Sequence, residues 1–399
     1  MAFIDFKESL KILENIKLSK IQTMEVGLME ALGYILADDI IASEDSPATP
    51  TSAMDGYAFI YEEGMEKLKI SGINPAGGEN LLEVKAGECI KTFTGSLMPK
   101  HSNTLIPIEN VEVNNGEIII KIPVKKGANV REIGENYAKD ELLIPSGTKI
   151  DFPQIGVMAS LNISKVKVYK KPIVGIFATG SELLDIGEIQ MLPSQIRSSN
   201  HLTIETIAKK YGAETIQFGC IKDDKKSIAS MMKKALESSD IVATTGGVSV
   251  GDYDFVKDVI REMGFEVLFQ GVHLKPGQHI MLAQSGDKFI LGLPGFAYSS
   301  TVTALIYLLP LVGKFIEYSN HLQCVKATLN EPYTKKSNKT EFIACNYYLQ
   351  GGKYMVDFAH KKLGTSAILT NLLGHSALMK LSPSDTIKNV GDEVEIYIF

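Results

Sequence analysis

The N-terminal residues place hydrophobic side chains at helical spacing. Phe6, Leu10, Leu13 and Ile16 recur every three or four positions, and the same period continues through the segment GLMEALGYILADDI. Apolar side chains at this spacing line one face of an amphipathic helix. We therefore predict two successive helices within residues 1–43.

A different pattern begins at residue 44 and continues to residue 133. Short β-type runs follow a turn-rich loop, and they read YAFIY, CIKTF, TLIPIENVEV and EIIIKIPV. Asn115-Gly116, between the last two runs, favours a type I′ hairpin turn. Residues 134–169 return to a helical pattern, with Pro153 in a first helical turn. We predict a β-rich domain at 44–133, inserted into a discontinuous N-terminal helical and linker domain formed by 1–43 and 134–169.

Residues 170–315 alternate strand-like runs with amphipathic helical segments. This alternation is typical of a doubly wound parallel sheet, so the chain is predicted to be a multidomain α/β protein. Ligands of such sheets collect beyond the carboxyl ends of the strands. Three loops follow strands and are expected to meet at that edge: TGSELL, GGVSVGDYD and LPGF. Residues 316–399 return to β-type runs and are predicted to form a C-terminal β domain.

The composition indicates a globular, cytoplasmic protein. Of 399 residues, 45% are hydrophobic and 22% are charged, and the formal net charge of −6 lacks the basic footprint of a nucleic-acid binder. The start, MAFIDFKESLK, has no apolar segment of a signal peptide. The longest apolar run, residues 301–313, is too short to span a membrane. Four scattered cysteines fit a reducing compartment, and neither nucleic acid nor membrane is expected as a partner.

The loop after the first strand of the predicted sheet combines groups that suit anions and cations. Gly180 allows a ligand to approach the backbone, and the hydroxyl and N–H groups of Thr179 and Ser181 suit an oxyanion. Glu182 offers carboxylate oxygens to a hard cation. A plain turn with a solvated glutamate is the alternative interpretation.

The loop GGVSVGDYD carries the more specific pattern. The N–H groups of Gly246, Gly247 and Ser249, together with the dipole of the following helix, suit a phosphate. Asp252 or Asp254 suits a Mg²⁺ ion that bridges this phosphate. The alternative is that Asp254 only caps the next helix.

Two further polar segments precede predicted helices. Asp223 and Asp224 form either part of a metal site or an N-cap with a second acid that the helix dipole favours. Ser199 either caps its helix or binds an anion at the helix N-terminus.

Two turns flank the same sheet edge. Lys275 offers a point charge to an oxyanion, and Pro294-Gly295 forms a rigid turn. The seven histidines show no spacing typical of a zinc site, and Cys220 is predicted to be a buried thiol without a pairing base.

A series of motifs occurs in one order along the chain: SAMDGYA, TFTG, TGSEL, IRSSN, GGVSVGDYDF, KPG and GLPG. Taken together, the series resembles the MoeA/gephyrin E-domain family, the molybdopterin molybdenumtransferases, over nearly the whole chain. The resemblance implies a helical segment, a β-rich domain, a doubly wound domain of the molybdopterin-binding type and a C-terminal β-barrel-like domain.

The resemblance also implies a reaction. Members of the family take adenylylated molybdopterin and molybdate, insert the metal at the dithiolene sulfurs and release AMP, with Mg²⁺ assisting. They are homodimers whose cleft lies between the doubly wound domain and the partner's SAMDGYA domain. Molybdopterin adenylyltransferase and apo-molybdoenzymes are the implied protein partners.

The site residues that we expect follow from these motifs and from the strand-end argument. Those matching the family's functional positions are Asp55, Thr94, Glu182, Asp223, Asp254, Lys275 and Pro294. Catalytic roles are expected for Asp55, Glu182, Asp254 and Lys275, and metal binding is expected for Glu182, Asp223 and Asp254. Cofactor binding is expected for Thr94, Thr179, Gly180, Ser181, Ser199, Gly246, Gly247, Ser249, Pro294 and Gly295.

Several positions depart from the family pattern. KPGKP is replaced by a segment ending in Gln278-His279, and LPGNP is replaced by one containing Phe296 and Ala297. Further departures are Asn103, Gly271 and Asn338-Lys339. The oxyanion half of the site therefore loses positive charges and an amide donor.

The alternative function is a diverged paralogue that binds pterin or nucleotide with weak insertion, or that uses tungstate. A scaffold module and a molybdopterin adenylyltransferase are less favoured.

Overall fold

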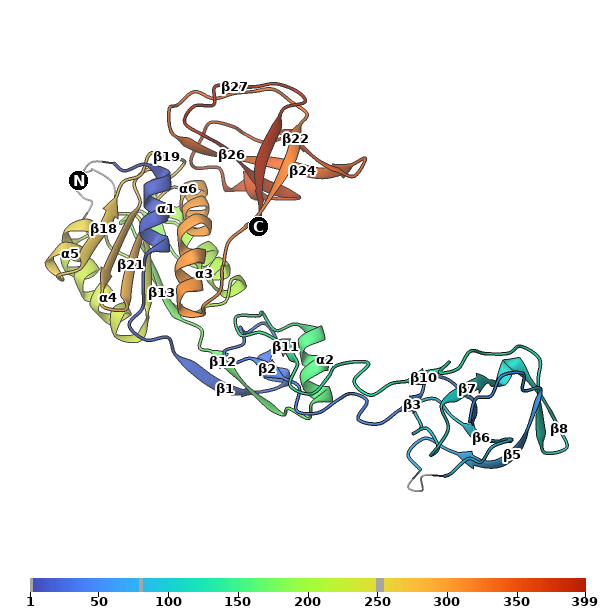
Figure 1. Ribbon diagram of the computed structural model, residues 1–399. Helices are drawn as coiled ribbons and strands as arrows, with labels where there is room; N and C mark the ends of the chain where they lie inside the picture. Colours follow the sequence, from blue (N-terminus) through green and yellow to red (C-terminus); the bar gives the residue numbers. More distant parts are fainter. Residues whose placement is uncertain (1–2, 79–81, 249–254) are drawn as a thin grey trace. The chain divides into compact units, whose positions relative to one another are not determined.

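The computed structural model describes residues 3–78, 82–248 and 255–399 (Figure 1). The chain forms two compact units, each with its own core. Unit 1 comprises Met1–Ala37, Gly147–Asp151 and Lys165–Phe399, and unit 2 comprises Asp38–Ser146 and Phe152–Ser164. The four-part division made from the sequence stays a prediction.

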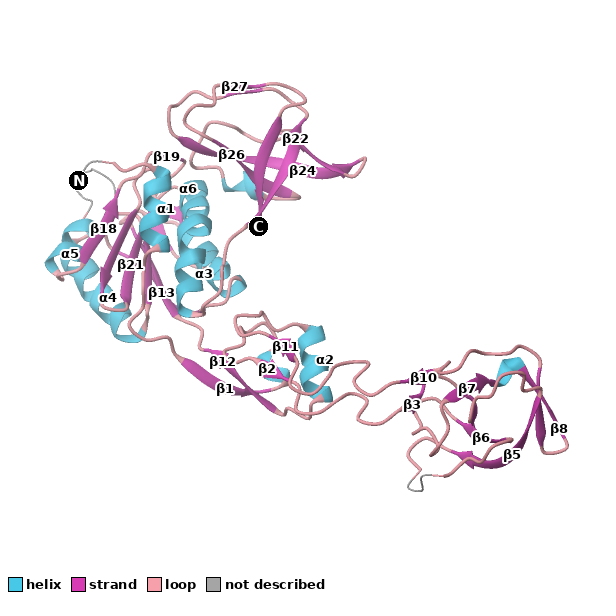
Figure 2. Ribbon diagram, in the orientation of Figure 1, coloured by secondary structure: helices cyan, strands magenta, loops and turns pink. Residues whose placement is uncertain are grey.

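The centre of unit 1 is a six-stranded sheet covered by helices on both faces (Figure 2). Its strands in spatial order are β16 (Glu214–Ile221), β13 (Ile173–Thr179), β17 (Ile241–Thr245), β21 (Lys288–Leu293), β20 (Met281–Ser285) and β18 (Glu266–Gln270). The first four are parallel, as predicted for a doubly wound sheet. β20 runs antiparallel to both of its neighbours, β21 and β18, and a two-residue turn at Gly286-Asp287 joins it directly to β21.

Alternate residues of the central strands enter two separate cores. Ile241 and Ala243 of β17 face the first core, and Val242 between them faces the second. Such strands read as continuous apolar runs because both faces are covered. The helices that cover the sheet are α1 (Phe6–Glu14), α3 (Asn200–Lys210), α6 (Ala297–Thr303) and α7 (Leu309–Phe315) for the first core, and α4 (Lys225–Ser238) and α5 (Val256–Glu262) for the second. A π-helical turn, Ala304–Leu308, links α6 to α7.

The C-terminal part of unit 1 is a closed five-stranded barrel. The strands are β22 (Gln323–Leu329), β24 (Thr340–Gln350), β25 (Lys353–Asp357), β26 (Ser376–Leu381) and β28 (Glu393–Ile398). β24 pairs with both β25 and β26, and this second pairing closes the ring. Closure leaves no open sheet edge among these strands. The expected barrel-like domain is confirmed. The short strand β19 (Leu274–Lys275) pairs with the start of β24, and β23 (Tyr333–Thr334) pairs with β27 (Ile387–Lys388).

Unit 2 contains a second six-stranded sheet. Its order is β7 (Thr104–Pro107), β4 (Gly56–Phe59), β6 (Glu88–Thr92), β5 (Lys67–Asn74), β9 (Glu117–Ile120) and β8 (Val111–Asn114). The predicted hairpin turn forms between β8 and β9, where Asn115 and Gly116 have φ values of 48° and 83°. Positive φ at both positions is the requirement of a type I′ turn. Two short pairs, β3 (Thr51–Ser52) with β10 (Val130–Arg131) and β2 (Ile40–Ile41) with β11 (Leu142–Ile144), complete the strands of this unit.

One predicted helix is absent, and a second predicted helical segment is helical only in its last part. Residues 27–40 contain only the 3-10 turn Met29–Ala31 after the strand β1 (Thr23–Gly27), which pairs with β12 (Lys165–Tyr169). The reason is non-local pairing: the Gly33 N–H donates to the Ile150 carbonyl at 2.9 Å. In the region 134–161 only α2 (Phe152–Ser160) is helical, with Pro153 in its first turn as expected. No helix within the described ranges has the length and apolar character of a membrane span.

Candidate functional site

The loops after three parallel strands line one cavity of about 410 Å³ in unit 1. They follow β13, β17 and β21, so the strand-end argument correctly predicts this convergence, including the described part of the glycine-rich loop. Residues selected from the sequence that line the cavity are Thr179, Gly180, Glu182, Asp223, Gly246, Gly247, Pro294 and Gly295. Ser249 and Asp254 lie outside the described residues. Among the residues that the structure does describe, Ser181 and Ser199 are not part of this lining.

The two glycines after β17 have no room for a side chain. Gly246 and Gly247 have φ values of 92° and 65°. A Cβ on Gly246 would lie 2.5 Å from the Thr179 carbonyl oxygen, and one on Gly247 would lie 2.7 Å from a methyl group of Val256. Both positions therefore require glycine, and both line the cavity without a side chain.

Asn200, at the start of α3, ties two of the loops together. Its side-chain amide donates to the Thr245 hydroxyl at 3.0 Å and to the Gly295 carbonyl at 2.7 Å. The Thr245 hydroxyl in turn donates to the Pro294 carbonyl at 2.9 Å. Ser199, the residue of IRSSN selected from the sequence, makes no capping hydrogen bond with its side chain. Asn200, the last residue of IRSSN, was missed because its hydrogen-bond partners are distant in sequence.

Two adjacent acids before α4 have different environments. Asp224 is the N-cap: it accepts a hydrogen bond from the Ser227 N–H at 2.9 Å and a second one from the Ser227 hydroxyl. These bonds stabilise the charged form and lower the pKa of Asp224. Asp223 instead lines the cavity, as does Glu182.

The oxygen donors on this side of the cavity fit a Mg²⁺ ion. Glu182 and Asp223 come from two separate loops, and Thr179 lines the same cavity. The Thr179 hydroxyl oxygen is buried and makes no hydrogen bond with any residue that the structure describes. Carboxylate and hydroxyl oxygens are ligands of the hard type that Mg²⁺ prefers.

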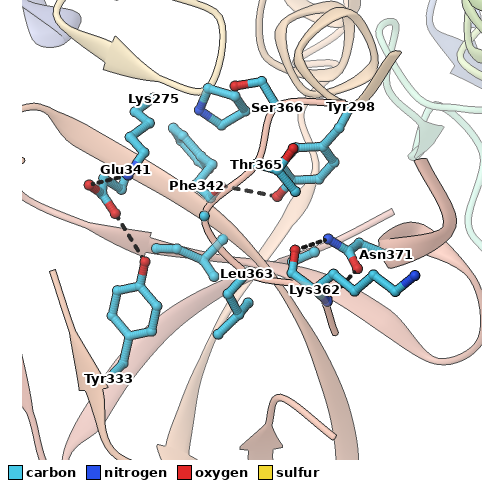
Figure 3. Close-up of a pocket in the computed structure, with 14 residues that line it drawn as sticks. Lys275, Tyr298, Tyr333, Glu341, Phe342, Lys362, Leu363, Thr365, Ser366 and Asn371 are labelled. Atoms are coloured by element: carbon cyan, nitrogen blue, oxygen red, sulfur yellow. Dashed lines mark hydrogen bonds and ion pairs between the residues drawn. The ribbon is translucent and has the colours of Figure 1, made fainter. Parts of the chain in front are cut away.

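Lys275 lies outside the lining of this cavity and borders a smaller one of about 30 Å³ (Figure 3). Its ammonium is 3.3 Å from Glu341 Oε1, since β19 places Lys275 directly beside Glu341 on β24. Glu341 is 1% exposed and also accepts hydrogen bonds from the Ser337 hydroxyl at 2.7 Å and the Tyr333 hydroxyl at 3.1 Å. Burial, with the Glu341 charge adding to it, raises the pKa of Tyr333. Lys275 is therefore already engaged by a buried carboxylate.

A second lysine, Lys339, is linked to the main cavity by a chain of two neighbouring side chains. Lys339 donates a short hydrogen bond to Gln278 Oε1, and the Gln278 amide nitrogen is 2.9 Å from His279 Nε2. His279 lines the main cavity, as does the bulky Phe296, which is 64% exposed. Gln278 and Phe296, which the sequence identified only as departures from the family pattern, are thus both connected to the site.

In unit 2, the motif SAMDGYA presents a charged carboxylate. Asp55 Oδ1 accepts hydrogen bonds from the Thr94 N–H at 2.8 Å and from the Thr94 hydroxyl at 2.7 Å. Both bonds stabilise the ionised form and lower the pKa of Asp55, and Lys91 adds a smaller effect in the same direction. The two residues taken from SAMDGYA and TFTG thus form one pair.

The expectation about Cys220 and the histidines is wrong in one respect. Cys220 Sγ lies 3.9 Å from Nδ1 of His201, because the end of β16 runs beside the first turn of α3. Sequence spacing could not show this contact, since 18 residues separate the two.

Comparisons with known proteins agree with this architecture. Residues 4–162 match the model of the MoeA N-terminal region (domain I and II), and residues 175–314 match that of the probable molybdopterin binding domain. A molybdopterin molybdenumtransferase of Nostoc sp. is 31% identical over 94% of this chain and 88% of its own. One from Staphylococcus epidermidis is 28% identical over 92% and 88%. A crystal structure of the molybdopterin biosynthesis MoeA protein from Pyrococcus horikoshii superposes with a TM-score of 0.84 at 29% identity, covering 100% of both chains.

The fold and the strand-end cavity define a protein with a molybdopterin-binding α/β domain joined to a closed β-barrel. More specifically, the chain belongs to the MoeA family of molybdopterin molybdenumtransferases. It is a transferase of molybdenum cofactor biosynthesis.

The Asp55–Thr94 pair gives a first prediction. Replacement of Thr94 by valine removes the hydroxyl donor and keeps the backbone one, so the pKa of Asp55 should rise toward its ordinary value. Titration of the Asp55 side-chain carboxyl by NMR measures this shift. The matched substitution Thr334→Val, in unit 1, should leave the Asp55 titration unchanged. An unchanged pKa in Thr94→Val would show that the backbone bond alone sets it.

Proposed function

We propose that this protein inserts molybdate into adenylylated molybdopterin and releases AMP with the assistance of Mg²⁺. The observation that carries the proposal is the single cavity in which side-chain-free backbone and two carboxylates meet. A pyrophosphate requires N–H groups and positive charge, and carboxylates cannot supply either to an anion directly. They act through a cation placed between them and the phosphate oxygens.

The residues of the cavity divide between these tasks. Gly246 and Gly247 expose backbone where a phosphate would approach, next to the buried Thr179 hydroxyl. Glu182 and Asp223 would hold Mg²⁺. When bound, this ion neutralises charge that develops on the departing AMP phosphate. Asn200 keeps the Pro294-Gly295 turn against the end of β17 through its two hydrogen bonds. The third expected acid, Asp254, belongs to the same proposed site.

The oxyanion part of the site supports a second candidate function. Lys275 faces the buried Glu341, and Lys339 donates to Gln278, so two of the cations near the cavity already have acceptors. A molybdate ion would have to compete with these contacts. This favours the alternative of a diverged paralogue that binds pterin or nucleotide with weak insertion, or that uses tungstate.

We further propose a cytoplasmic homodimer. Asp55 and Thr94 belong to unit 2, whereas Glu182 and Asp223 belong to unit 1. A two-fold pairing in which each cleft combines one protomer's Glu182 with its partner's SAMDGYA segment would produce two equivalent sites. Molybdopterin adenylyltransferase and apo-molybdoenzymes are the proposed protein partners before and after the reaction.

The metal-side acids can be tested by AMP release. Glu182→Gln and Asp223→Asn should each slow it by about 100-fold or more, because each removes a charged ligand of the ion. Raising the Mg²⁺ concentration should restore part of the rate. If both acids hold one ion, the loss of rate in the double variant should be much smaller than the product of the two single losses. Glu237→Gln, on the exposed face of α4, is the control and should keep the wild-type rate.

Normal AMP release in both single variants would remove these acids from the mechanism. A slow rate that does not respond to added Mg²⁺ would contradict their role as ligands, and it would leave them only a structural one.

The oxyanion departures are tested by restoring the family residues. The variant Gln278→Lys with Phe296→Asn and Ala297→Pro should lower the molybdate concentration for half-maximal insertion by about ten-fold, since each charge-assisted contact contributes about 1.5–3 kcal/mol. Molybdate and tungstate are titrated separately, with reconstitution of an apo-molybdoenzyme as the readout. Gln350→Lys adds the same charge at an exposed end of β24 and should change neither curve. No gain for either oxyanion would favour the diverged paralogue.

Complementation tests the shared cleft. Asp55→Ala and Glu182→Ala, each inactive alone, should recover about a quarter of the wild-type activity when co-expressed, because half of the dimers are mixed and one of their two clefts is intact. Co-expression of Glu182→Ala with Asp223→Ala should recover nothing, since both changes affect the same half of a cleft. A fully active monomer, or no recovery in the first pair, would refute the shared cleft.

A further inference from the structure

Three side chains of metal-ligand type meet beside the main cavity, outside its lining. Asp185, His201 and Cys220 each offer one ligand atom, and these atoms lie within 4.8 Å of one another. Asp185 follows the short strand β14 (Leu183–Leu184), which pairs with β15 (Ile196–Arg197). His201 lies in the first turn of α3, and Cys220 lies near the end of β16. The cluster therefore joins three separate elements.

The distances around His201 suit a metal centre. Its Nε2 lies 3.2 Å from Asp185 Oδ1. Two ligands that are each about 2.0–2.1 Å from a tetrahedral ion lie about 3.3 Å from one another. On the other side of the ring, Nδ1 lies 2.9 Å from the Ser198 hydroxyl. A metal-bound histidine usually donates its second ring N–H to a neighbouring oxygen, which fixes the ring. Ser198 occupies that position and leaves Nε2 to face the carboxylate. The Cys220 sulfur lies 3.9 Å from Nδ1, so binding of one ion at Nε2 requires the thiol to rotate toward Asp185.

A bulge in β16 positions the thiol. Between Ile176 and Ala178 of β13, the partner residue on β16 advances from Gln217 to Cys220, so one residue is inserted. Bulges of this kind redirect a side chain, and they occur often next to functional sites. Gly219 within the bulge has φ of 75°, and a Cβ there would lie 3.0 Å from Asp185 Oδ2. The glycine thus allows the carboxylate to approach the strand beside the thiol.

The cluster is buried at His201 and partly exposed at Asp185. The His201 side chain is 1% exposed, and that of Asp185 is 38% exposed. An ion could therefore enter past Asp185, and water would fill a remaining coordination position. Burial raises the pKa of the Cys220 thiol, so the sulfur carries its proton until a metal displaces it.

We propose that Asp185, His201 and Cys220 bind one Zn²⁺ ion. Thiolate, imidazole and carboxylate together are typical zinc ligands, whereas Mg²⁺ prefers oxygen ligands alone. The site is thus distinct in chemistry from the pair Glu182 and Asp223. Its ligands are close in sequence to cavity residues: Asp185 to Glu182, His201 to Asn200, and Cys220 to Asp223. A bound ion would hold these three walls of the cavity together.

Metal titration of the full chain, first stripped with a chelator, tests the site. Co²⁺ should give one equivalent of binding and a thiolate-to-cobalt charge-transfer absorption, and Zn²⁺ should displace it. Cys220→Ser should abolish this absorption. Asp185→Asn should weaken Zn²⁺ binding by at least about ten-fold, measured by competition with a chromophoric chelator. Cys324→Ser, at an exposed cysteine on β22, is the matched control and should bind like the wild type.

Excess Mg²⁺ should not displace the cobalt, and Glu182→Gln should keep the absorption, so the result does not depend on the proposed transferase reaction. Circular dichroism of each metal-free variant shows whether it folds, and Asp185→Asn, at a partly exposed side chain, tests the site if Cys220→Ser does not fold. A wild-type chain without the absorption would overturn the proposal. An absorption that survives in folded Cys220→Ser, or Zn²⁺ affinity unchanged in Asp185→Asn, would also overturn it and would leave a buried, hydrogen-bonded histidine.

Discussion

The chemistry of unit 1 depends on a sheet that is covered on both faces. All five residues of β17 are buried, and the side chains of its first three, Ile241, Val242 and Ala243, alternate between two apolar cores. A polar group on either face would lose its hydration without a partner. Charged side chains such as Glu182 and Asp223 therefore gather where the strands end. The parallel direction of β13, β17 and β21 brings those ends to one edge, and the cavity forms there.

Burial also determines whether Lys275 is available to an anion. Glu341 is almost completely buried and keeps its charge partner Lys275 together with two hydroxyl donors. Separation of a buried carboxylate from its partner is costly, because the charge left behind is neither hydrated nor paired. An oxyanion near Lys275 therefore meets a competitor that the fold itself supplies. This internal carboxylate, together with Gln278 as the acceptor of Lys339, leaves both lysines with partners inside the fold.

Local sequence patterns correctly predicted those elements whose structure depends mainly on neighbouring residues. The alternation of strands and helices, the Asn115-Gly116 turn and Pro153 in a first turn were all accessible from short stretches of sequence. The barrel and the motif series came from resemblance to a family. The failures share one cause, which is contact between distant segments. Residues 27–40 pair with the segment around Ile150 rather than forming a helix, and Asn200 acts through loops that are far away along the chain.

Asp223 and Asp224 show how a helix start can separate two identical side chains. Asp224 adopts extended backbone angles, with φ of −126° and ψ of 147°, and turns its carboxylate back toward the Ser227 N–H. The N–H groups of the first helical turn have no acceptor within the helix, and they favour this capping. Asp223, one residue before the cap, lines the cavity instead. One of two adjacent aspartates therefore stabilises the start of the helix, while the other lies at the strand-end cavity. Their chemical identity alone could not separate these two positions.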